Sequence, residues 1–204
     1  MSQHVFAQPL KGDEYGRFRV KISGNSGAGK STLGAELARV LGVPFISLDA
    51  IYWLPGWQEL PDDEFRAIVA ATLDKAQGGW VVDGNYSRPL GDIVDGAATD
   101  IVWLDPPFLL YFPRLIWRTF RRLFRLEESC SDGCEESWLK TFFSRDSIIW
   151  WCMTNHTVVQ ARIKKFMAAD DPSAGGPGKY IHLGGWGGEQ DAWLRDVKAM
   201  ARSK

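Results

Sequence analysis

A segment near the N-terminus has the residue types and the spacing that bind phosphate. It consists of Gly24, Asn25, Ser26, Gly27, Ala28, Gly29, Lys30 and Ser31, and it matches the pattern G-x-x-x-x-G-K-[ST]. Glycines let backbone N–H groups turn toward phosphate oxygens, and a helix that starts there adds the positive end of its dipole. In this pattern Lys30 reaches the β- and γ-phosphates and the Ser31 hydroxyl binds Mg²⁺, while Thr32 is interpreted as a hydrogen-bonding residue at the helix start. The segment therefore predicts a binding site for ATP and Mg²⁺ over residues 24–32.

Aspartates at the ends of apolar segments are candidates for binding the metal and the acceptor. Asp83 ends the apolar run that starts at Trp80 and is the expected Walker-B-type carboxylate, which holds Mg²⁺ directly or through water. Asp105 ends the next apolar run and competes for this role, but the two prolines that follow it favour a structural turn. Asp49 could hold an acceptor hydroxyl or act as a general base at the carboxyl edge of a sheet, where open α/β folds bind ligands. Alternatively, Asp49 is the N-cap of a short helix over 50–52.

An arginine-rich stretch is expected to form one face of a helix. The arginines are Arg114, Arg118, Arg121, Arg122 and Arg125, and no acidic residue occurs between 106 and 126. Arginine suits bidentate contact with phosphate, so one interpretation is a lid over the triphosphate, in which Arg118 and Arg122 act at the transferring group. Two other interpretations stay open: a solvated face that pairs with acids elsewhere, and a patch for nucleic acid. Arg88 is a separate candidate for binding an anionic acceptor.

Composition and charge exclude several classes of protein. The chain has 204 residues, which predicts one domain, and 45% of them are hydrophobic, which argues against disorder. A net charge of −1 predicts no general attraction to nucleic acid or membranes. No apolar run is long enough to span a membrane, and the first residues lack the layout of a signal peptide, so a cytoplasmic protein is expected.

The cysteines are few and odd in number, which indicates reduced thiols rather than a disulfide framework. Cys130, Cys134 and Cys152 are the only three in the chain. With His156 they could form a four-ligand zinc site, in which Cys152 and His156 would lie one turn apart on a helix. Three reduced thiols are the preferred interpretation.

Strand-like and helix-like segments alternate along the chain. Strands are expected at 18–23, 45–48, 80–83, 101–104 and 180–183, and helices at 30–41, 61–77, 106–125, 138–167 and 189–201. This order predicts an α/β domain with a parallel sheet covered by helices on both faces. Residues 1–16 are expected to be a disordered lead-in and residues 17–204 the domain, with the lid at about 114–138.

Several segments outside the phosphate-binding loop have an unusual composition. They are Leu48-Asp49-Ala50-Ile51-Tyr52-Trp53 with Pro55-Gly56-Trp57, Val82-Asp83-Gly84-Asn85-Tyr86, and Trp103-Leu104-Asp105 before the arginine-rich helix. Over about residues 18–200 the chain resembles the adenylate-kinase-like P-loop proteins, and within them the branch labelled DNA topology modulation proteins. The resemblance implies a nucleotide-kinase fold of three layers with a five-stranded parallel sheet, ATP as donor, and Mg²⁺. In nucleoside monophosphate kinases the element at Asp83 continues as Asp-Gly-Phe-Pro-Arg, whereas here Arg88 comes one residue later, which leaves the acceptor open.

These features predict an ATP-binding P-loop kinase that transfers the γ-phosphoryl group to a small acceptor, which is a nucleotide, a nucleoside or another metabolite. Two alternatives remain. One is a nucleotide-dependent protein that binds nucleic acid or has a regulatory role, and the other is a simple ATPase. Binding to a nucleic acid backbone would weaken steeply with salt, which distinguishes the first alternative from a kinase.

Overall fold

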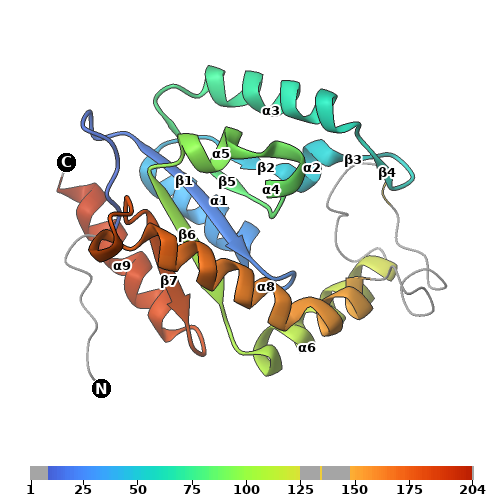
Figure 1. Cartoon of the computed structure of the whole chain (residues 1–204). Helices are drawn as coiled ribbons and strands as arrows, with labels where there is room; N and C mark the ends of the chain where they lie inside the picture. The colour runs from blue at the N-terminus through green and yellow to red at the C-terminus, as the bar shows by residue number, and fades with distance from the viewer. Residues whose placement is uncertain (1–8, 125–133, 135–147, 204) are drawn as a thin grey trace.

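A parallel sheet forms the centre of the structure, which is a computed structural model that describes residues 9–124, 134 and 148–203. Its five strands are β1 (Phe18–Gly24), β2 (Phe45–Ser47), β5 (Gly79–Asp83), β6 (Asp100–Asp105) and β7 (Tyr180–Gly184). They are ordered β2-β5-β1-β6-β7, and all four neighbouring pairs are parallel (Figure 1). The residues after each strand therefore meet at one edge of the sheet. The expected α/β fold is confirmed.

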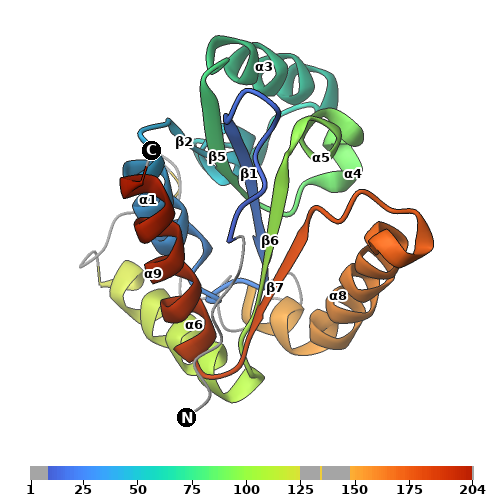
Figure 2. The ribbon, with the colours of Figure 1, turned by 90° about the vertical axis from the view of Figure 1, so that its left-hand side faces the viewer.

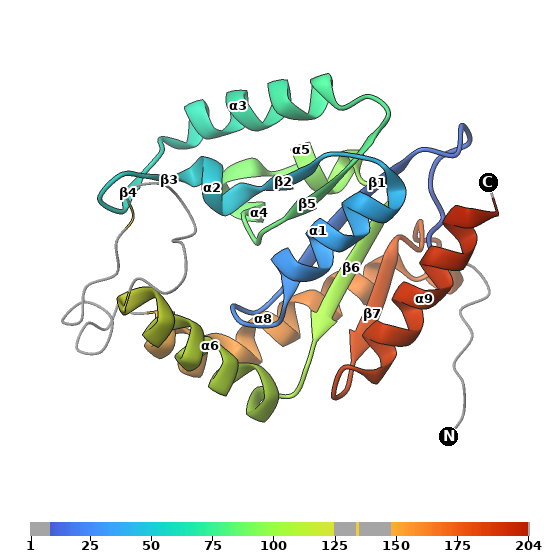
Figure 3. The ribbon, with the colours of Figure 1, turned by 180° about the vertical axis from the view of Figure 1, so that it is seen from behind.

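Helices cover both faces of this sheet. On one face lie α1 (Lys30–Leu41) and α9 (Gly188–Arg202), and on the other lie α3 (Asp62–Lys75), α4 (Ser87–Leu90) and α5 (Asp92–Ala97) (Figures 2 and 3). The helix α8 (Ile148–Asp170) lies on the same side as α4 and α5 in Figure 2, and the 3₁₀ turn η1 (Pro172–Ala174) follows it. The domain thus has three layers.

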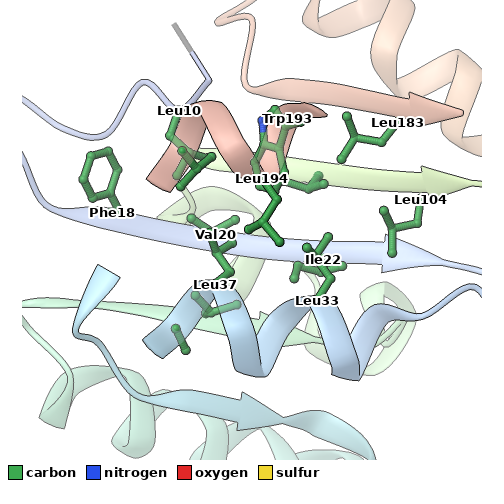
Figure 4. Packing of buried hydrophobic residues seen from close by; sticks show 14 of the residues in the cluster. Leu10, Phe18, Val20, Ile22, Leu33, Leu37, Leu104, Leu183, Trp193 and Leu194 are labelled. Atoms are coloured by element: carbon green, nitrogen blue, oxygen red, sulfur yellow. The ribbon is translucent and has the colours of Figure 1, made fainter. Parts of the chain in front are cut away.

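Strands β5 and β6 are apolar over most of their length because both of their faces are buried. In β1, Val20 and Ile22 point into the layer that holds α1 and α9, where Leu33, Leu37 and Trp193 meet them (Figure 4). Side chains on the opposite face of the sheet, among them Trp80 and Val82 of β5, pack against α3, α4 and α5. Two hydrophobic layers therefore hold the sheet rigidly at the edge that carries the predicted site.

Residues 9–16 are held against the domain by several contacts. The Pro9 carbonyl accepts a hydrogen bond from the indole N–H of Trp193 at 2.8 Å, and Leu10 is only 1% exposed. The backbone N–H groups of Lys11 and Gly12 donate to the carboxylate of Asp100. The expectation of a disordered lead-in is therefore wrong from Pro9 onward, because these contacts with residues distant in the chain fix the segment. Residues 1–8 lie outside the described residues.

Of the short elements between β2 and β6, only the first was anticipated, as a short helix over 50–52. They are α2 (Leu48–Tyr52), the two-stranded hairpin of β3 (Trp53–Leu54) and β4 (Gln58–Glu59), and the helices α4 and α5. The helix α6 (Phe108–Leu123) begins before Pro113, so this proline lies inside the helix and does not start it. The predicted loop at 127–137, and with it most of the lid at 114–138, falls largely outside the described residues.

Candidate active site

The glycine-rich segment forms the turn between β1 and α1, as predicted (Figure 1). Gly27 and Gly29 have φ values of 84° and 93°, which side-chain-bearing residues rarely adopt. A Cβ on Gly27 would also lie 2.9 Å from the carbonyl oxygen of Tyr111 in α6. Gly29 occupies the N-cap of α1 and supplies no side-chain acceptor, so the first N–H groups of the helix remain suited to an anion. The loop geometry thus agrees with phosphate binding.

Ser31 and Asp83 meet at this turn although 52 residues separate them in the sequence. The Ser31 hydroxyl donates to Oδ2 of Asp83 at 2.6 Å. This contact arises because β5 pairs directly with β1, which places Asp83 opposite Ile22, two residues before Gly24. Asp83 is 1% exposed, and its Oδ1 atom is buried with no hydrogen-bond partner among the residues that the structure describes.

Burial raises the pKa of Asp83 above its ordinary value, because a charged carboxylate loses its hydration there. Side-chain hydrogen bonds from Ser31 and Ser47 and the charge of Lys30 oppose this rise in pKa, whereas the nearby charge of Asp49 adds to it. A buried carboxylate oxygen that no described residue bonds, next to a hydroxyl, is a donor set that suits Mg²⁺, which prefers oxygen ligands. The residues present therefore fit this ion.

Lys30 lies over the same loop. Its ammonium group donates to the carbonyl oxygen of Asn25 at 3.1 Å. Lys30 also acts on Asp83 through its charge, so the side chain is within electrostatic range of the predicted metal ligands. The structure thus gathers Lys30, Ser31 and Asp83 around one turn.

Asp105, the competing carboxylate, is engaged elsewhere. Its Oδ1 accepts a hydrogen bond from Gln160 of α8 at 2.6 Å, and its Oδ2 lies 3.3 Å from Nε2 of His182 in β7. The His182 ring in turn stacks on Trp103 with centroids 4.4 Å apart. These contacts agree with the structural role that the sequence favoured for Asp105.

Asp49 lies near Asp83 but is not a helix cap. The N-cap of α2 is Ser47, and Asp49 belongs to the first turn of that helix, so the alternative interpretation of Asp49 as an N-cap is wrong. Its Oδ1 accepts a hydrogen bond from the Tyr86 hydroxyl at 2.7 Å. Tyr86 itself packs against Tyr52 and Phe65. The carboxylate of Asp49 is therefore oriented by a tyrosine that is fixed in an aromatic cluster.

Asn85 has a structural role that sequence reasoning missed. Its side-chain amide donates to the carbonyl oxygen of Gly24 at 2.7 Å and accepts from the N–H of the same residue at 3.4 Å. The two bonds join the segment after β5 to the first residue of the phosphate-binding loop. The D-G-N-Y element that carries the family resemblance was the available signal, because it places an amide two residues after Asp83.

The helix α6 packs on the glycine-rich loop and brings one predicted arginine to it. Tyr111 and Leu115 are fully buried, and Nη2 of Arg118 donates to the Ser26 hydroxyl at 2.9 Å. Arg114 and Arg121 are exposed, Arg122 is half-buried, and Arg125 lies outside the described residues. Arg88 is exposed in α4, shortly after the Asp83–Tyr86 segment. The structure thus places Arg118 at the loop by a direct contact.

The predicted zinc ligands fall mainly outside the description. Cys134 is buried, and its Sγ atom lies 3.2 Å from the carbonyl oxygen of Leu54. Cys130 and the side chains of Cys152 and His156 are among the residues that the structure does not describe. Within the described residues, no group of three or more His, Cys, Asp or Glu side chains could hold a metal ion. In the same part of the chain, no helix is both long and apolar enough to cross a membrane.

Comparison with known proteins finds kinases. Shikimate kinase from Halorhodospira halophila (strain DSM 244 / SL1) is 33% identical over 122 residues, which cover 54% of this chain and 69% of that protein. A gluconokinase from Sinorhizobium meliloti 1021 is 17% identical in sequence, with a TM-score of 0.46 over 91% of this chain and 94% of that one. Shikimate kinase from Acinetobacter baumannii in complex with shikimate is also 17% identical, with a TM-score of 0.48 over 92% and 95%. No family model matches the chain.

Proposed function

Since the chain belongs to the P-loop kinase family that includes shikimate kinase, we propose that it transfers the γ-phosphoryl group of ATP to a hydroxyl group of a small metabolite. It is a phosphotransferase, and the open question is which acceptor it uses. Within the family, the L-D-A-I-Y-W and D-G-N-Y elements support membership of the branch labelled DNA topology modulation proteins. ATP use and the small, odd number of cysteines in the sequence support a cytoplasmic location.

The observation that carries the proposal is the hydrogen bond between Ser31 and Asp83 beside the glycine-rich loop, with the charge of Asp49 close enough to act on Asp83. The N–H groups of the loop and of the first turn of α1 would bind the phosphates, and Lys30 would place its charge on the transferring group. Ser31 and Asp83 would hold Mg²⁺, which supplies positive charge against the phosphate oxygens when it is bound.

Asp49 is the proposed general base and acceptor ligand. As the acceptor oxygen bonds to the γ-phosphorus, its proton passes to the Asp49 carboxylate, and the bond from phosphorus to the β–γ bridging oxygen breaks to release ADP. The hydrogen bond from Tyr86 fixes the direction of the carboxylate, so that its second oxygen can face the acceptor hydroxyl. Arg88 is the proposed partner of any anionic group on the acceptor.

The arginines of α6 are proposed to close over the reaction. Arg118 already contacts the loop through Ser26, and the exposed arginines lie on the same helix. Positive charge placed there would neutralise the phosphates and help to exclude water, whose attack would waste ATP. Arg122 is proposed as the second arginine that acts at the transferring group.

The test is an acceptor screen that measures ADP release from ATP and Mg²⁺. The acceptors are nucleoside monophosphates, nucleosides and small hydroxylated metabolites, including shikimate and gluconate, and the reaction with water alone gives the baseline. We expect ADP release to rise well above the baseline with one class of hydroxylated metabolite. The Lys30→Ala protein, purified in parallel, should release ADP neither with water alone nor with that acceptor.

Two results would contradict the proposal. ADP release that no acceptor increases would indicate a simple ATPase. Binding of DNA that falls steeply between about 50 and 200 mM salt, without acceptor-dependent turnover, would indicate the alternative function in nucleic acid binding, as expected for contacts with a phosphate backbone.

A further inference from the structure

A cleft of about 360 Å³ lies at the amino ends of the strands, at the edge of the sheet opposite the phosphate-binding loop. Its walls are the turn at residues 11–13, the start of β1 at Arg19, the segment 96–99 before β6, and Pro177 and Lys179 before β7. Arg19 and Gly24 belong to the same strand, and a strand rises by about 3.3 Å per residue. The cleft is thus separated from the loop by the length of β1, which is roughly 17 Å from Arg19 to Gly24.

Two carboxylates hold the walls in place and are already bonded. The buried carboxylate of Asp100 accepts the N–H groups of Lys11 and Gly12 at 2.6 and 3.1 Å, and the Thr99 hydroxyl at 2.6 Å. Asp13 accepts two hydrogen bonds from Arg17. Burial tends to raise the pKa of Asp13, but these hydrogen bonds and the charge of Arg17 outweigh it and lower the pKa. Both carboxylates therefore act as anchors of the cleft wall.

Three cationic side chains line the same cleft, and backbone carbonyls are the main acceptors for two of them. The ammonium group of Lys11 donates to the Pro177 carbonyl at 3.1 Å. That of Lys179 donates to the carbonyls of Gly96 and Asp95 at 3.3 and 3.5 Å. A carbonyl carries no net charge, and an ammonium group has three donors, so these contacts leave both charge and donors unused.

Arg19 is the third cation. Its Nη2 lies 3.6 Å from Oδ2 of Asp13, and its Nε is buried and has no hydrogen-bond partner among the described residues. Among the described residues, Asp13 is the only acid that lines the cleft, so the described lining carries two net positive charges. Two more charged residues, Arg17 and Asp100, bond to the residues of the wall. Their charges are opposite and cancel, so the net charge around the cleft stays at two positive charges.

We propose that the cleft is a second anion-binding site that takes a phosphate group borne by a small molecule. Cationic side chains that line one cleft and keep unused N–H donors suit a compact oxyanion of charge −2. The cleft volume is in the range of pockets for small ligands. The site is formed by four segments that are far apart in the sequence, and it shares no residue with the site of phosphoryl transfer. Its occupation does not depend on the proposed function of that site.

The test is a titration of the full chain with inorganic phosphate, followed by the NMR signals of individual backbone amides at constant ionic strength. Residue-resolved signals separate this cleft from the phosphate-binding loop, which should also bind phosphate. We expect saturable shifts of the amides of Gly12, Gly96 and Ala98, with an affinity that differs from the one reported by Gly27 and Gly29.

Variants then assign the binding to the cations. Lys179→Gln should weaken the affinity measured at Gly12 and Gly96 by about tenfold, the factor expected for loss of one charge-assisted hydrogen bond, and should leave the affinity at Gly27 unchanged. Lys165→Gln, an exposed lysine of α8 outside the cleft lining, is the matched control and should change neither affinity. Lys11→Gln repeats the test from the other wall in case Lys179→Gln disturbs the fold.

Three results would overturn the proposal. The first is phosphate-induced shifts confined to the amides of the phosphate-binding loop. The second is an affinity at Gly12 and Gly96 that neither lysine variant lowers. The third is equal or tighter binding of citrate, which would show that charge alone, and not a phosphate group, is recognised.

Discussion

The substitution Asp83→Asn should make the metal-free protein more stable and the enzyme inactive. In the structure the Asp83 carboxylate is 1% exposed, Oδ2 accepts the Ser31 hydroxyl, and Oδ1 is buried without a partner. Folding therefore removes the Oδ1 atom from water, and no residue in the described part of the chain gives it a hydrogen bond in return. A group retained in this unfavourable setting is expected to serve function rather than stability.

The size of the effect follows from this geometry. Leaving a buried polar group unsatisfied costs about 1–3 kcal/mol. Asparagine keeps one oxygen for the Ser31 hydroxyl but introduces an N–H₂ group that also needs a partner, so the gain should lie at the lower end, at about 1 kcal/mol. For a domain of this size, that free energy corresponds to a rise in Tm of about 2–4 °C.

The stability difference should also depend on pH. Burial raises the pKa of Asp83 above its ordinary value of 3.8, so between these two pKa values the folded protein binds more protons than the unfolded chain. The wild type consequently loses stability as the pH rises through this window. The advantage of Asp83→Asn should be complete above the raised pKa and should disappear as the pH falls below 3.8.

Mg²⁺ with a non-hydrolysable ATP analogue should reverse the order of stability. A ligand at 100 times its Kd stabilises the folded state by about 2.7 kcal/mol, and the variant, which lacks one proposed metal ligand, should gain less. The assay is thermal unfolding followed by circular dichroism, with EDTA or with Mg²⁺ and the analogue, from pH 4 to 8, alongside measurement of turnover.

Asp105→Asn is the matched control, because both oxygens of Asp105 have partners in α8 and β7. This control should be less stable than the wild type in both conditions and should keep its Mg²⁺ response. The reasoning would be refuted if Asp83→Asn were less stable than the wild type in EDTA, or if Asp105→Asn alone lost the response to Mg²⁺.

Further predictions concern the remaining groups of the site. Lys30→Ala should lower ATP turnover by about 10²–10³-fold with an unchanged circular dichroism spectrum, and normal turnover would exclude the proposed phosphate contact. Asp49→Ser should lower the rate of phosphoryl transfer by about 10²-fold or more with little change in Tm. Tyr86→Phe should lower that rate by a smaller factor, because it removes only the orienting hydrogen bond. Equal turnover in Asp49→Ser and wild type would exclude Asp49 as a general base. With the ATP analogue and Mg²⁺, amides of residues 118–124 should gain protection from hydrogen exchange. Arg118→Gln, which retains a donor toward Ser26 but no charge, should reduce that gain. Protection by DNA alone would contradict a lid.

Some of the site could be predicted from the sequence because it depends on neighbouring residues. The turn from Gly24 to Ser31 is contiguous, and its glycines and the following helix start determine its geometry locally. The alternation of buried strands with amphipathic helices likewise follows from the local period of apolar residues, and it sufficed to predict the α/β class. That the short helix over 48–52 starts before Asp49 escaped prediction, because five residues show no clear period.

Other parts depend on strand order, which local patterns do not contain. Both Asp83 and Asp105 end strands that pair with β1, but only Asp83 accepts the Ser31 hydroxyl. The oxygens of Asp105 instead contact side chains of α8 and β7. The bonds from Asn85 to Gly24 need β5 to lie directly beside β1, although β2 precedes β5 in the chain. These are long-range pairings, whose free energy comes from packing the whole sheet.

The sequence by itself thus determined a phosphate-binding turn, a parallel α/β fold and a set of candidate carboxylates and arginines. The tertiary structure decided which of them meet: it brought Arg118 of α6 to Ser26, oriented Asp49 through Tyr86, and fixed the chain from Pro9 onward. It also formed the cationic cleft at the far edge of the sheet from segments that carry no motif. The physical reason is that a turn is specified by backbone conformation over a few residues, whereas a charge pair or a cleft is specified by which distant segments the core packs side by side.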